Sequence, residues 1–368
     1  MNQDRSIGVA GRAPGRVARA VRAERATWVE RTTRAVLQLR RRLAVVLAAG
    51  LLAGLLLAIA APVQAQTVRL RFAHSLSTNE PFHEAAEFFA RNVAQRSNGG
   101  IAIEVFPSEQ LGSLKETMEM IRQGAGVIVS TDSGYLADFV PDFGILNGPY
   151  LIRDQAEFRK LLASDWYREL VEKARGAGFQ VLAFNWFFGA RHIIADRPVR
   201  RLDDFKGLSI RVPPVPMFIE TFKSLGARGV TLNFSEVYNG LQQRVVEAAE
   251  APLPTLYGVK LHEVAKTVSL TSHFVAYLGL SMNRAVFDRL TAEQRTILLE
   301  EAARAGEHMA QLTEKRQQSV IAEMESKGVK FVRDVDVAAF QRATEPVYKA
   351  FPKWTPGLHD RVRGILAP

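Results

Sequence analysis

Arg211 is the residue whose type and setting most clearly allow binding chemistry. In the run Ser209-Ile210-Arg211-Val212-Pro213, strand alternation places its side chain on the face opposite Ile210 and Val212. A guanidinium stays charged and offers a planar fork of donors, so it can grip a carboxylate with two hydrogen bonds. Two charge-assisted bonds of about 1.5–3 kcal/mol each amount to roughly two to four decades of affinity. The alternative is an exposed strand residue that binds nothing.

A second cation follows an aromatic run. Trp186-Phe187-Phe188 comes after a predicted strand at 180–184 and directly precedes Gly189-Ala190-Arg191. Three large aromatic side chains at the end of a strand, followed by an arginine, would suit a ligand cleft at the carboxyl edge of a sheet. We therefore expect this run to lie beside a ligand.

Other chemistry has little support in the sequence. The chain has no cysteine, which excludes disulfides, thiol nucleophiles and cysteine-ligated metals. Neither His83-Glu84 nor His262-Glu263 has the second histidine of a zinc-protease motif, and we find no nucleophile elbow, P-loop or EF-hand loop. Acid pairs such as Asp203-Asp204 are more often solvated surface groups than acid–base pairs. We expect no metal, no cofactor and no enzymatic activity.

The elements that must position these residues alternate between strand and helix. The first set has strands at 68–72, 101–105, 127–129 and 180–184, separated by helices at 81–97, 114–123 and 154–175. The second set has strands at 208–212, 245–248, 275–282 and 329–332, and its helices include one from 292 to about 326. This order predicts an α/β fold with a mostly parallel sheet covered by helices. The last of these helices is long enough to reach across two domains.

The charge of the chain is concentrated at its start. The 368 residues carry a net charge of +10, but residues 1–42 hold eleven arginines against three acids, a net +8. An uncharged run at 43–61 and the small-residue ending at Ala65 follow, the order of a secretory signal cleaved after Ala65. An uncleaved membrane anchor is the alternative, and residues 1–39 are either genuine leader or an overlong gene start. Residues 66–368 carry only +2, so a nucleic-acid partner has no support.

Several short strings resemble the dicarboxylate-type solute-binding proteins of TRAP transporters over residues 68–350. The most specific are Gly189-Ala190-Arg191, the run from Asp204-Phe205-Lys206-Gly207-Leu208 to Arg211-Val212-Pro213, and Phe234-Ser235-Glu236-Val237-Tyr238. The resemblance implies a two-lobed periplasmic-binding fold, with a cleft between the lobes and a long helix spanning both. We expect one lobe to comprise 66–188 with 277–316 and the other 189–276 with 317–368.

The resemblance also implies roles for individual residues. Arg211 matches the family's principal arginine, which pairs with the ligand carboxylate, while Arg191 matches the second arginine and Phe234 the aromatic residue beside the ligand. The remaining predicted ligand-binding residues are Asp132, His74, Trp186, Phe188, Glu250 and Ala251.

One departure from the family pattern concerns the ligand. Many relatives have Gln-Glu-Asn-Pro where this chain has Ala249-Glu250-Ala251-Pro252, so the asparagine amide that usually contacts the ligand is replaced by a methyl group. Phe188 also stands where smaller polar residues are frequent. We therefore expect an acid with an apolar or aromatic body rather than a small sugar acid or a C4-dicarboxylate.

The resemblance implies an exported, periplasmic binding protein that captures an organic acid for a sodium-driven TRAP transporter. Its partners would be the acid and the small and large integral permease subunits. One alternative is a binding protein that delivers the same ligand to a sensory receptor. The other is an exported enzyme acting on an organic acid.

Overall fold

The computed structural model describes residues 15–59 and 67–367, and the chain divides into two compact units, Met1–Ala65 and Gln66–Pro368. In the first unit, residues Gly15–Ile59 form the helix α1. The predicted cleavage site after Ala65 lies outside the described residues. Within those residues, no helix meets the combined length and hydropathy that a membrane crossing needs.

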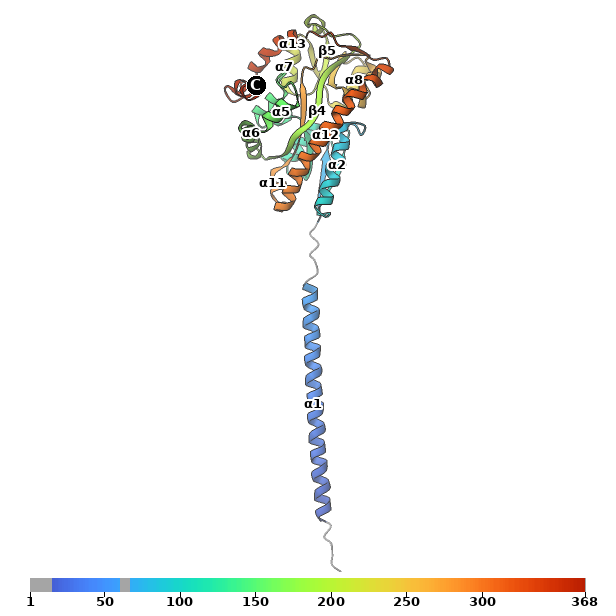
Figure 1. Cartoon of the computed structure of the whole chain (residues 1–368), viewed down its shortest axis with the longest axis vertical. Helices are drawn as coiled ribbons and strands as arrows, with labels where there is room; N and C mark the ends of the chain where they lie inside the picture. Colours follow the sequence, from blue (N-terminus) through green and yellow to red (C-terminus); the bar gives the residue numbers. More distant parts are fainter. Residues whose placement is uncertain (1–14, 60–66, 368) are drawn as a thin grey trace, which may run out of the picture. The chain divides into compact units, whose positions relative to one another are not determined.

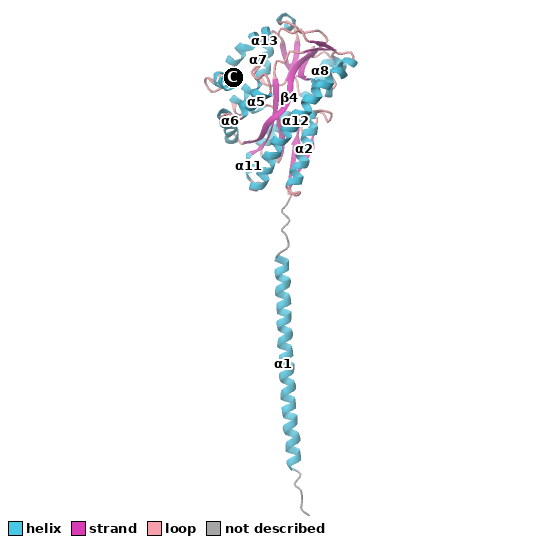
Figure 2. Ribbon diagram, viewed as in Figure 1, coloured by secondary structure: helices cyan, strands magenta, loops and turns pink. Residues whose placement is uncertain are grey.

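The second unit is built on ten strands, with helices packed around them (Figure 2). In sheet order, eight of them run β2-β1-β3-β9-β4-β7-β5-β6, and β8 joins β4 to β10. The strands are β1 Val68–Ala73, β2 Ile101–Phe106, β3 Val127–Thr131, β4 Phe179–Ala195, β5 Ser209–Val212, β6 Arg228–Thr231, β7 Ala248–Pro252, β8 Thr267–Ser269, β9 Val275–Asn283 and β10 Lys330–Val332.

The helices of this unit vary widely in length. They are α2 Pro81–Arg96, α3 Leu114–Arg122, α4 Ser133–Leu136, α5 Gln155–Leu162, α6 Asp165–Gly176, α7 Pro216–Ser224, α8 Val237–Gln242, α9 Leu253–Gly258, α10 Leu261–Val264, α11 Arg284–Asp288, α12 Ala292–Ser326, α13 Val337–Thr344 and α14 Leu358–Leu366.

The long strand β4 links the two halves of the sheet. From Phe179 to Ala190 it pairs antiparallel with β9, and from Arg191 to Ala195 with β7. The predicted end of this strand at Phe184 is wrong, because the aromatic run continues it through three irregularities in register. The predicted parallel pairing is found within two groups of strands, β1 with β2 and β3, and β5 with β6 and β7. β4 and β9 run antiparallel to their neighbours, so the sheet is mixed.

The predicted long helix is confirmed as α12, which has 35 residues. Thr291 begins it with a capping box, since its hydroxyl accepts from the Gln294 amide and the Gln294 side chain accepts from the Thr291 amide. It packs along α2 and β4 (Figure 1) and also contacts α9. One helix therefore contacts both halves of the unit.

Two smaller predictions needed correction. The helix predicted at 154–175 is two helices, because Ser164 caps a new start with its hydroxyl and separates α5 from α6. The strand predicted at 245–248 lies later, at Ala248–Pro252, so the string Ala249-Glu250-Ala251-Pro252 is itself strand β7.

Hydrophobic clusters lie in both of the sheet halves that β4 links. One pair of clusters packs around the first strands and includes Phe72 and Phe143, and another pair packs around β5 to β8 and includes Phe218 and Leu256. The exact division into lobes stays a proposal, since Gln66–Pro368 is one compact unit. The C-terminal helix α14 packs on α5, although the proposed boundary assigns it to the second lobe.

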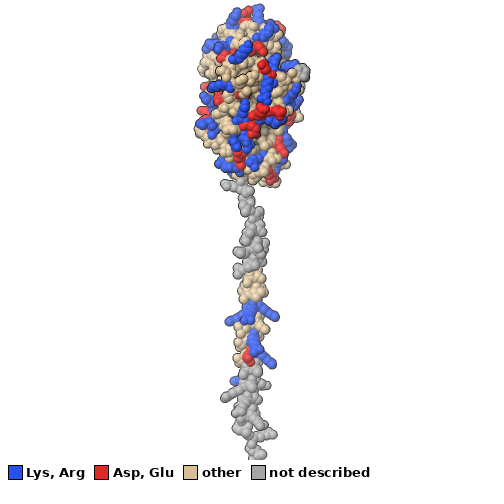
Figure 3. Space-filling model, turned by 90° about the vertical axis from the view of Figure 1, so that its left-hand side faces the viewer, with Lys and Arg blue, Asp and Glu red and all other residues tan. Residues whose placement is uncertain are grey.

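Basic and acidic side chains are interspersed over the visible face of this unit (Figure 3). That distribution agrees with the near-neutral charge of residues 66–368.

Candidate functional site

A cavity of about 80 Å³ lies where the carboxyl ends of two groups of strands meet. β1, β2 and β3 are parallel, as are β5, β6 and β7, so each group delivers its following loops to one edge. The crossing strands β4 and β9 add Phe188, Arg191 and Leu278. The remaining lining residues are Ser75, Leu76, Glu109, Leu114, Ser130, Asp132, Tyr135, Arg211, Pro213, Phe218, Asn233, Phe234, Ala251 and Thr255.

Arg211 lies in this cavity with little access to solvent. Its side chain on β5 is buried at 4% exposure, so the alternative of an exposed strand residue is wrong. Nε and Nη2 donate to the Leu232 carbonyl at 3.0 and 2.7 Å. Among the described residues, no carboxylate oxygen lies within 4.0 Å of the guanidinium, which distinguishes it from Arg191. Burial lowers the pKa of Arg211 to about 10, so the group is still a cation at neutral pH.

Arg191, in contrast, is paired within the protein. Its Nε lies 2.5 Å from Glu250 Oε2 and its Nη2 lies 2.7 Å from Oε1, a bidentate pair with both side chains buried. His273 Nε2 lies 3.3 Å from the same Glu250 oxygen. Burial acts to raise the pKa of Glu250, but the charge and hydrogen bonds of Arg191, with help from His273, lower it to about 2.

Aromatic rings surround both guanidinium groups. The Phe234 ring lies 5.7 Å from the Arg211 guanidinium carbon, and the Phe218 and Phe188 rings lie 5.0 and 5.9 Å from that of Arg191. Cation–π contacts of this kind stabilise a desolvated cation. Ala251 lines the same cavity from β7. This wall of the cavity is therefore apolar apart from its two cations.

Asp132 lies on the opposite wall, at the start of α4. Its Oδ1 accepts from the Gly134 amide at 2.8 Å and from Asn147 Nδ2 at 2.6 Å. Burial raises the pKa of this carboxyl group. The second carboxylate oxygen has no protein donor among the described hydrogen bonds, so it is available to a ligand.

Three predicted residues lie near the cavity without lining it. Glu250 acts through Arg191, as described above. His74 is buried with its Nε2 3.1 Å from His83 Nδ1, and burial together with His83 lowers its pKa to about 3. Trp186 is fully buried, and its Nε1 donates to the Ala302 carbonyl at 3.0 Å.

Other lining residues were not predicted from the sequence, notably Glu109, Thr255 and Phe218. Glu109 lies between Pro107 and Gln110 in the loop after β2, outside the strings that indicated the family. Thr255 and Phe218 carried no signal, because their positions depend on how α9 and α7 pack.

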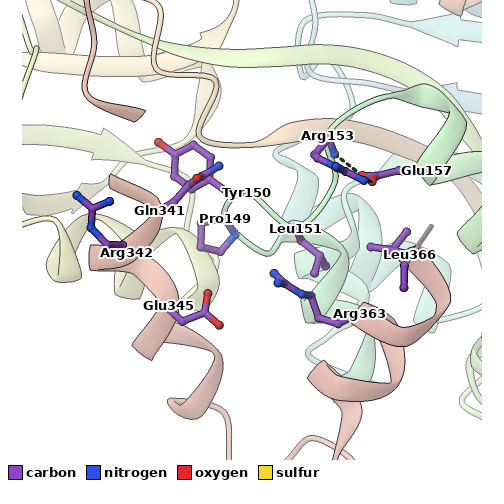
Figure 4. Close-up of a pocket in the computed structure, with 11 residues that line it drawn as sticks. Pro149, Tyr150, Leu151, Arg153, Glu157, Gln341, Arg342, Glu345, Arg363 and Leu366 are labelled. Atoms are coloured by element: carbon purple, nitrogen blue, oxygen red, sulfur yellow. Dashed lines mark hydrogen bonds and ion pairs between the residues drawn. The ribbon is translucent and has the colours of Figure 1, made fainter. Parts of the chain in front are cut away.

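A larger groove of about 770 Å³ lies elsewhere, beside α13 and α14 (Figure 4). Figure 4 shows Arg342, Glu345 and Arg363 spread along it, with Arg153 paired to Glu157 at one end. Its charged residues come from the surface and do not converge on one point, unlike those around Arg211. The described residues also contain no group of three or more potential metal ligands.

Comparison with known proteins identifies the family of the chain. Residues 72–353 match the model of bacterial extracellular solute-binding protein, family 7. The 2,3-diketo-L-gulonate-binding periplasmic protein of Escherichia coli (strain K12) is 33% identical over 298 residues, covering 80% of this chain and 90% of that protein.

Two solved structures are similar throughout the second unit. A TRAP periplasmic solute-binding protein from Ochrobacterium anthropi, with bound L-fuconate, has a TM-score of 0.80 and 35% identity, covering 82% of this chain and 100% of that one. A second, from Actinobacillus succinogenes with bound L-galactonate, has a TM-score of 0.79 and 32% identity, covering 81% and 99%. This chain therefore belongs to the bacterial extracellular solute-binding proteins of family 7, the solute-binding proteins of TRAP transport, and shares their two-lobed fold.

Proposed function

We propose that the captured acid is anchored by one carboxylate on Arg211. The observation that carries this proposal is that Arg211 is a buried cation with no carboxylate within 4.0 Å among the described residues. A buried charge without a counter-ion is costly, and a ligand carboxylate would remove that cost. Arg191 is less suited to anchor the acid because Glu250 already occupies two of its nitrogens.

The walls of the cavity favour a ligand with two different sides. Ala251, Phe188 and Phe218 would pack against an apolar part of the acid. Ser130, Asp132 and Thr255 lie among the polar lining residues and would bind hydroxyl or other donor groups. The apolar body expected from Ala251 and Phe188 is thus kept as one half of the proposed ligand, whereas the expectation that the ligand is not a small sugar acid is given up, because polar side chains line the rest of the cavity. The acid-sugar names of the relatives support hydrogen-bonding groups on the other half.

Closure of the two lobes would complete the binding step. It would remove water from around Arg211 and strengthen its interaction with the carboxylate, because the local dielectric constant falls. Phe234 already lies against Arg211 and would shield that contact. We propose that the closed protein docks on the small and large integral permease subunits and that the ligand leaves chemically unchanged. We also propose that the leader is cleaved after Ala65.

Identification of a co-purifying small molecule tests this function. The protein would be expressed with its leader, recovered from the periplasm, washed and denatured, and the released molecule would be analysed by mass spectrometry. The proposal predicts a carboxylic acid in about equal amount to the protein, lost when Arg211 is replaced by Ala. Release of a compound without a carboxylate, or conversion of the acid on incubation with fresh protein, would contradict it.

A further inference from the structure

Some of the charged side chains that line the cavity have no opposite charge paired with them within the described part of the protein. Among these, the carboxylates outnumber the cations. Arg191 and Arg211 are the cations that line the cavity, and Asp132 and Glu109 are the lining carboxylates. Since Glu250 neutralises Arg191, one cation is left to face a ligand, together with two acids. A ligand with one carboxylate would balance Arg211, but a second carboxylate would find no further cation in this lining.

We propose that Glu109 makes the cleft selective for acids with a single carboxylate and rejects dicarboxylates of the same length. This inference rests on the proposed function, because it takes Arg211 as the anchor of the first carboxylate. The substrate class is then a monocarboxylate whose far end carries a hydrogen-bond donor such as a hydroxyl group.

The backbone holds Glu109 firmly in its turn after β2. Glu109 has a φ of 60°, and its amide donates to the His74 carbonyl at 3.1 Å, which ties the turn to the end of β1. Its own carbonyl accepts from the Gly112 amide at 2.8 Å. These bonds fix the direction in which the side chain leaves the turn.

The Glu109 side chain reaches across the cavity mouth. Its Oε2 accepts from the Ser235 amide at 3.3 Å, and Ser235 follows Phe234, whose ring lies on Arg211. Burial lowers the pKa of Arg211, and the negative charges of Glu250 and, more weakly, of Glu109 act against that lowering. Glu109 is therefore near the anchor and half-buried, where a like charge is poorly screened.

The two acids in the lining make this repulsion hard to avoid. Because Glu109 and Asp132 both line the cavity that contains Arg211, the far carboxylate of a dicarboxylate would approach one or both of them while the near one stayed on Arg211. A hydroxyl group at the same place would instead donate to either acid. Like charges brought together in a partly desolvated site disfavour binding, whereas a donor facing a carboxylate favours it.

Matched pairs of acids test the selectivity, because each pair differs by one terminal carboxylate. Suitable pairs are L-galactonate with galactarate, glycerate with tartronate, and butanoate with succinate, titrated by calorimetry at pH 7.5 into protein freed of co-purified ligand. For any pair that binds, the monocarboxylate should bind at least tenfold more tightly than its partner. In Glu109→Gln the ratio of the two affinities should fall at least tenfold, because the dicarboxylate should bind more tightly.

Glu104→Gln is the matched control, since it removes the same charge from an exposed position on β2. It should leave the ratio within twofold of the wild type. Equal affinities of the wild type for the two acids of a pair, or equal effects of the two substitutions on the affinity ratio, would overturn the selectivity proposal. If no pair binds, the formula of the co-purified acid decides: one carboxylate supports the proposal, and two or more overturn it.

Arg211→Ala separates this inference from the function on which it rests. If Arg211→Ala abolishes binding while Glu109→Gln leaves the ratio unchanged, the anchor stands and only the selectivity role of Glu109 fails. If Arg211→Ala binds the monocarboxylate as tightly as the wild type, the anchor itself fails.

Discussion

The carboxylate of Glu80 accepts a 2.7 Å hydrogen bond from the hydroxyl of Thr255, 175 residues further along the chain. Glu80 precedes α2 and Thr255 lies in α9, so the bond joins the two proposed lobes beside the cavity. Ser77 completes the surroundings of the carboxylate with its amide at 2.9 Å and its hydroxyl at 3.1 Å. The bond is buried and involves no cation, which makes it sensitive to protonation.

Ligand affinity should therefore depend on pH through Glu80. We take the arrangement in which Thr255 is bonded to Glu80 as the closed state, and burial in it raises the pKa of Glu80 from 4.5 to about 7. A group with a higher pKa in the closed state takes up a proton on closing. Its contribution to the stability of the closed state is therefore full below pH 4.5 and is lost as the pH rises through 7. We expect affinity to fall about tenfold between pH 5.5 and 7.5 by this route. Calorimetric titration at both values measures the change.

Glu80→Gln is the comparison that isolates this effect. The amide keeps the shape, its oxygen can accept from Ser77 and its NH2 group can donate to the Thr255 hydroxyl oxygen, but it does not titrate. Asp132, whose pKa is raised by burial, and His74, whose pKa is lowered by burial and His83, also respond to pH and act equally in both proteins. The same pH dependence in wild type and Glu80→Gln would show that Glu80 does not control closure.

The two proposed lobes come close together at Gly134, and we expect that a side chain at this position would not be tolerated. A Cβ atom there would overlap both methyl groups of Val215, which precedes α7. We expect Gly134→Ala to weaken ligand binding at least tenfold, because the closed arrangement could form only if Val215 moved. Gly364→Ala in α14 is the control, since its Cβ would meet nothing within 4 Å. Equal affinities of the two variants, measured by titration, would contradict this contact.

The pair between Arg191 and Glu250 should stabilise the fold. Glu250→Ala would leave a buried guanidinium without its partner, which costs about 3–5 kcal/mol. We expect the free energy of unfolding, measured with urea, to fall by about that amount. Glu300→Ala, which removes an exposed partner of Arg96, should have a much smaller effect. Similar losses for the two substitutions would mean that burial of the Arg191 pair adds nothing.

Local patterns in the sequence predicted much of the fold. The capping box at Thr291 and the uninterrupted helical stretch after it predicted α12, and alternation predicted β1 and β2. The full length of β4 could not be predicted in this way. Nearly all of its side chains are buried, and its register shifts where it passes β9, so it has no simple alternation to detect.

The candidate site was predictable only in part for a similar reason. Arg211 and Phe234 lie in strings that resemble a known family, and the cavity contains both. The bond between Arg191 and Glu250 depends on the antiparallel pairing of β4 with β7, which brings together residues 59 positions apart. Trp186 faces the core because of its register in β4, and an aromatic run alone does not reveal which residue faces the ligand.

Titration of the co-purified acid into ligand-free wild type, Arg211→Ala and Arg211→Lys tests the central claim most directly. Arg211→Ala should lose at least tenfold in affinity while its thermal unfolding stays cooperative. The affinity of Arg211→Lys should lie between those of the wild type and Arg211→Ala, because an ammonium group keeps the charge but lacks the planar fork of donors. Wild-type affinity in Arg211→Ala would contradict the carboxylate anchor.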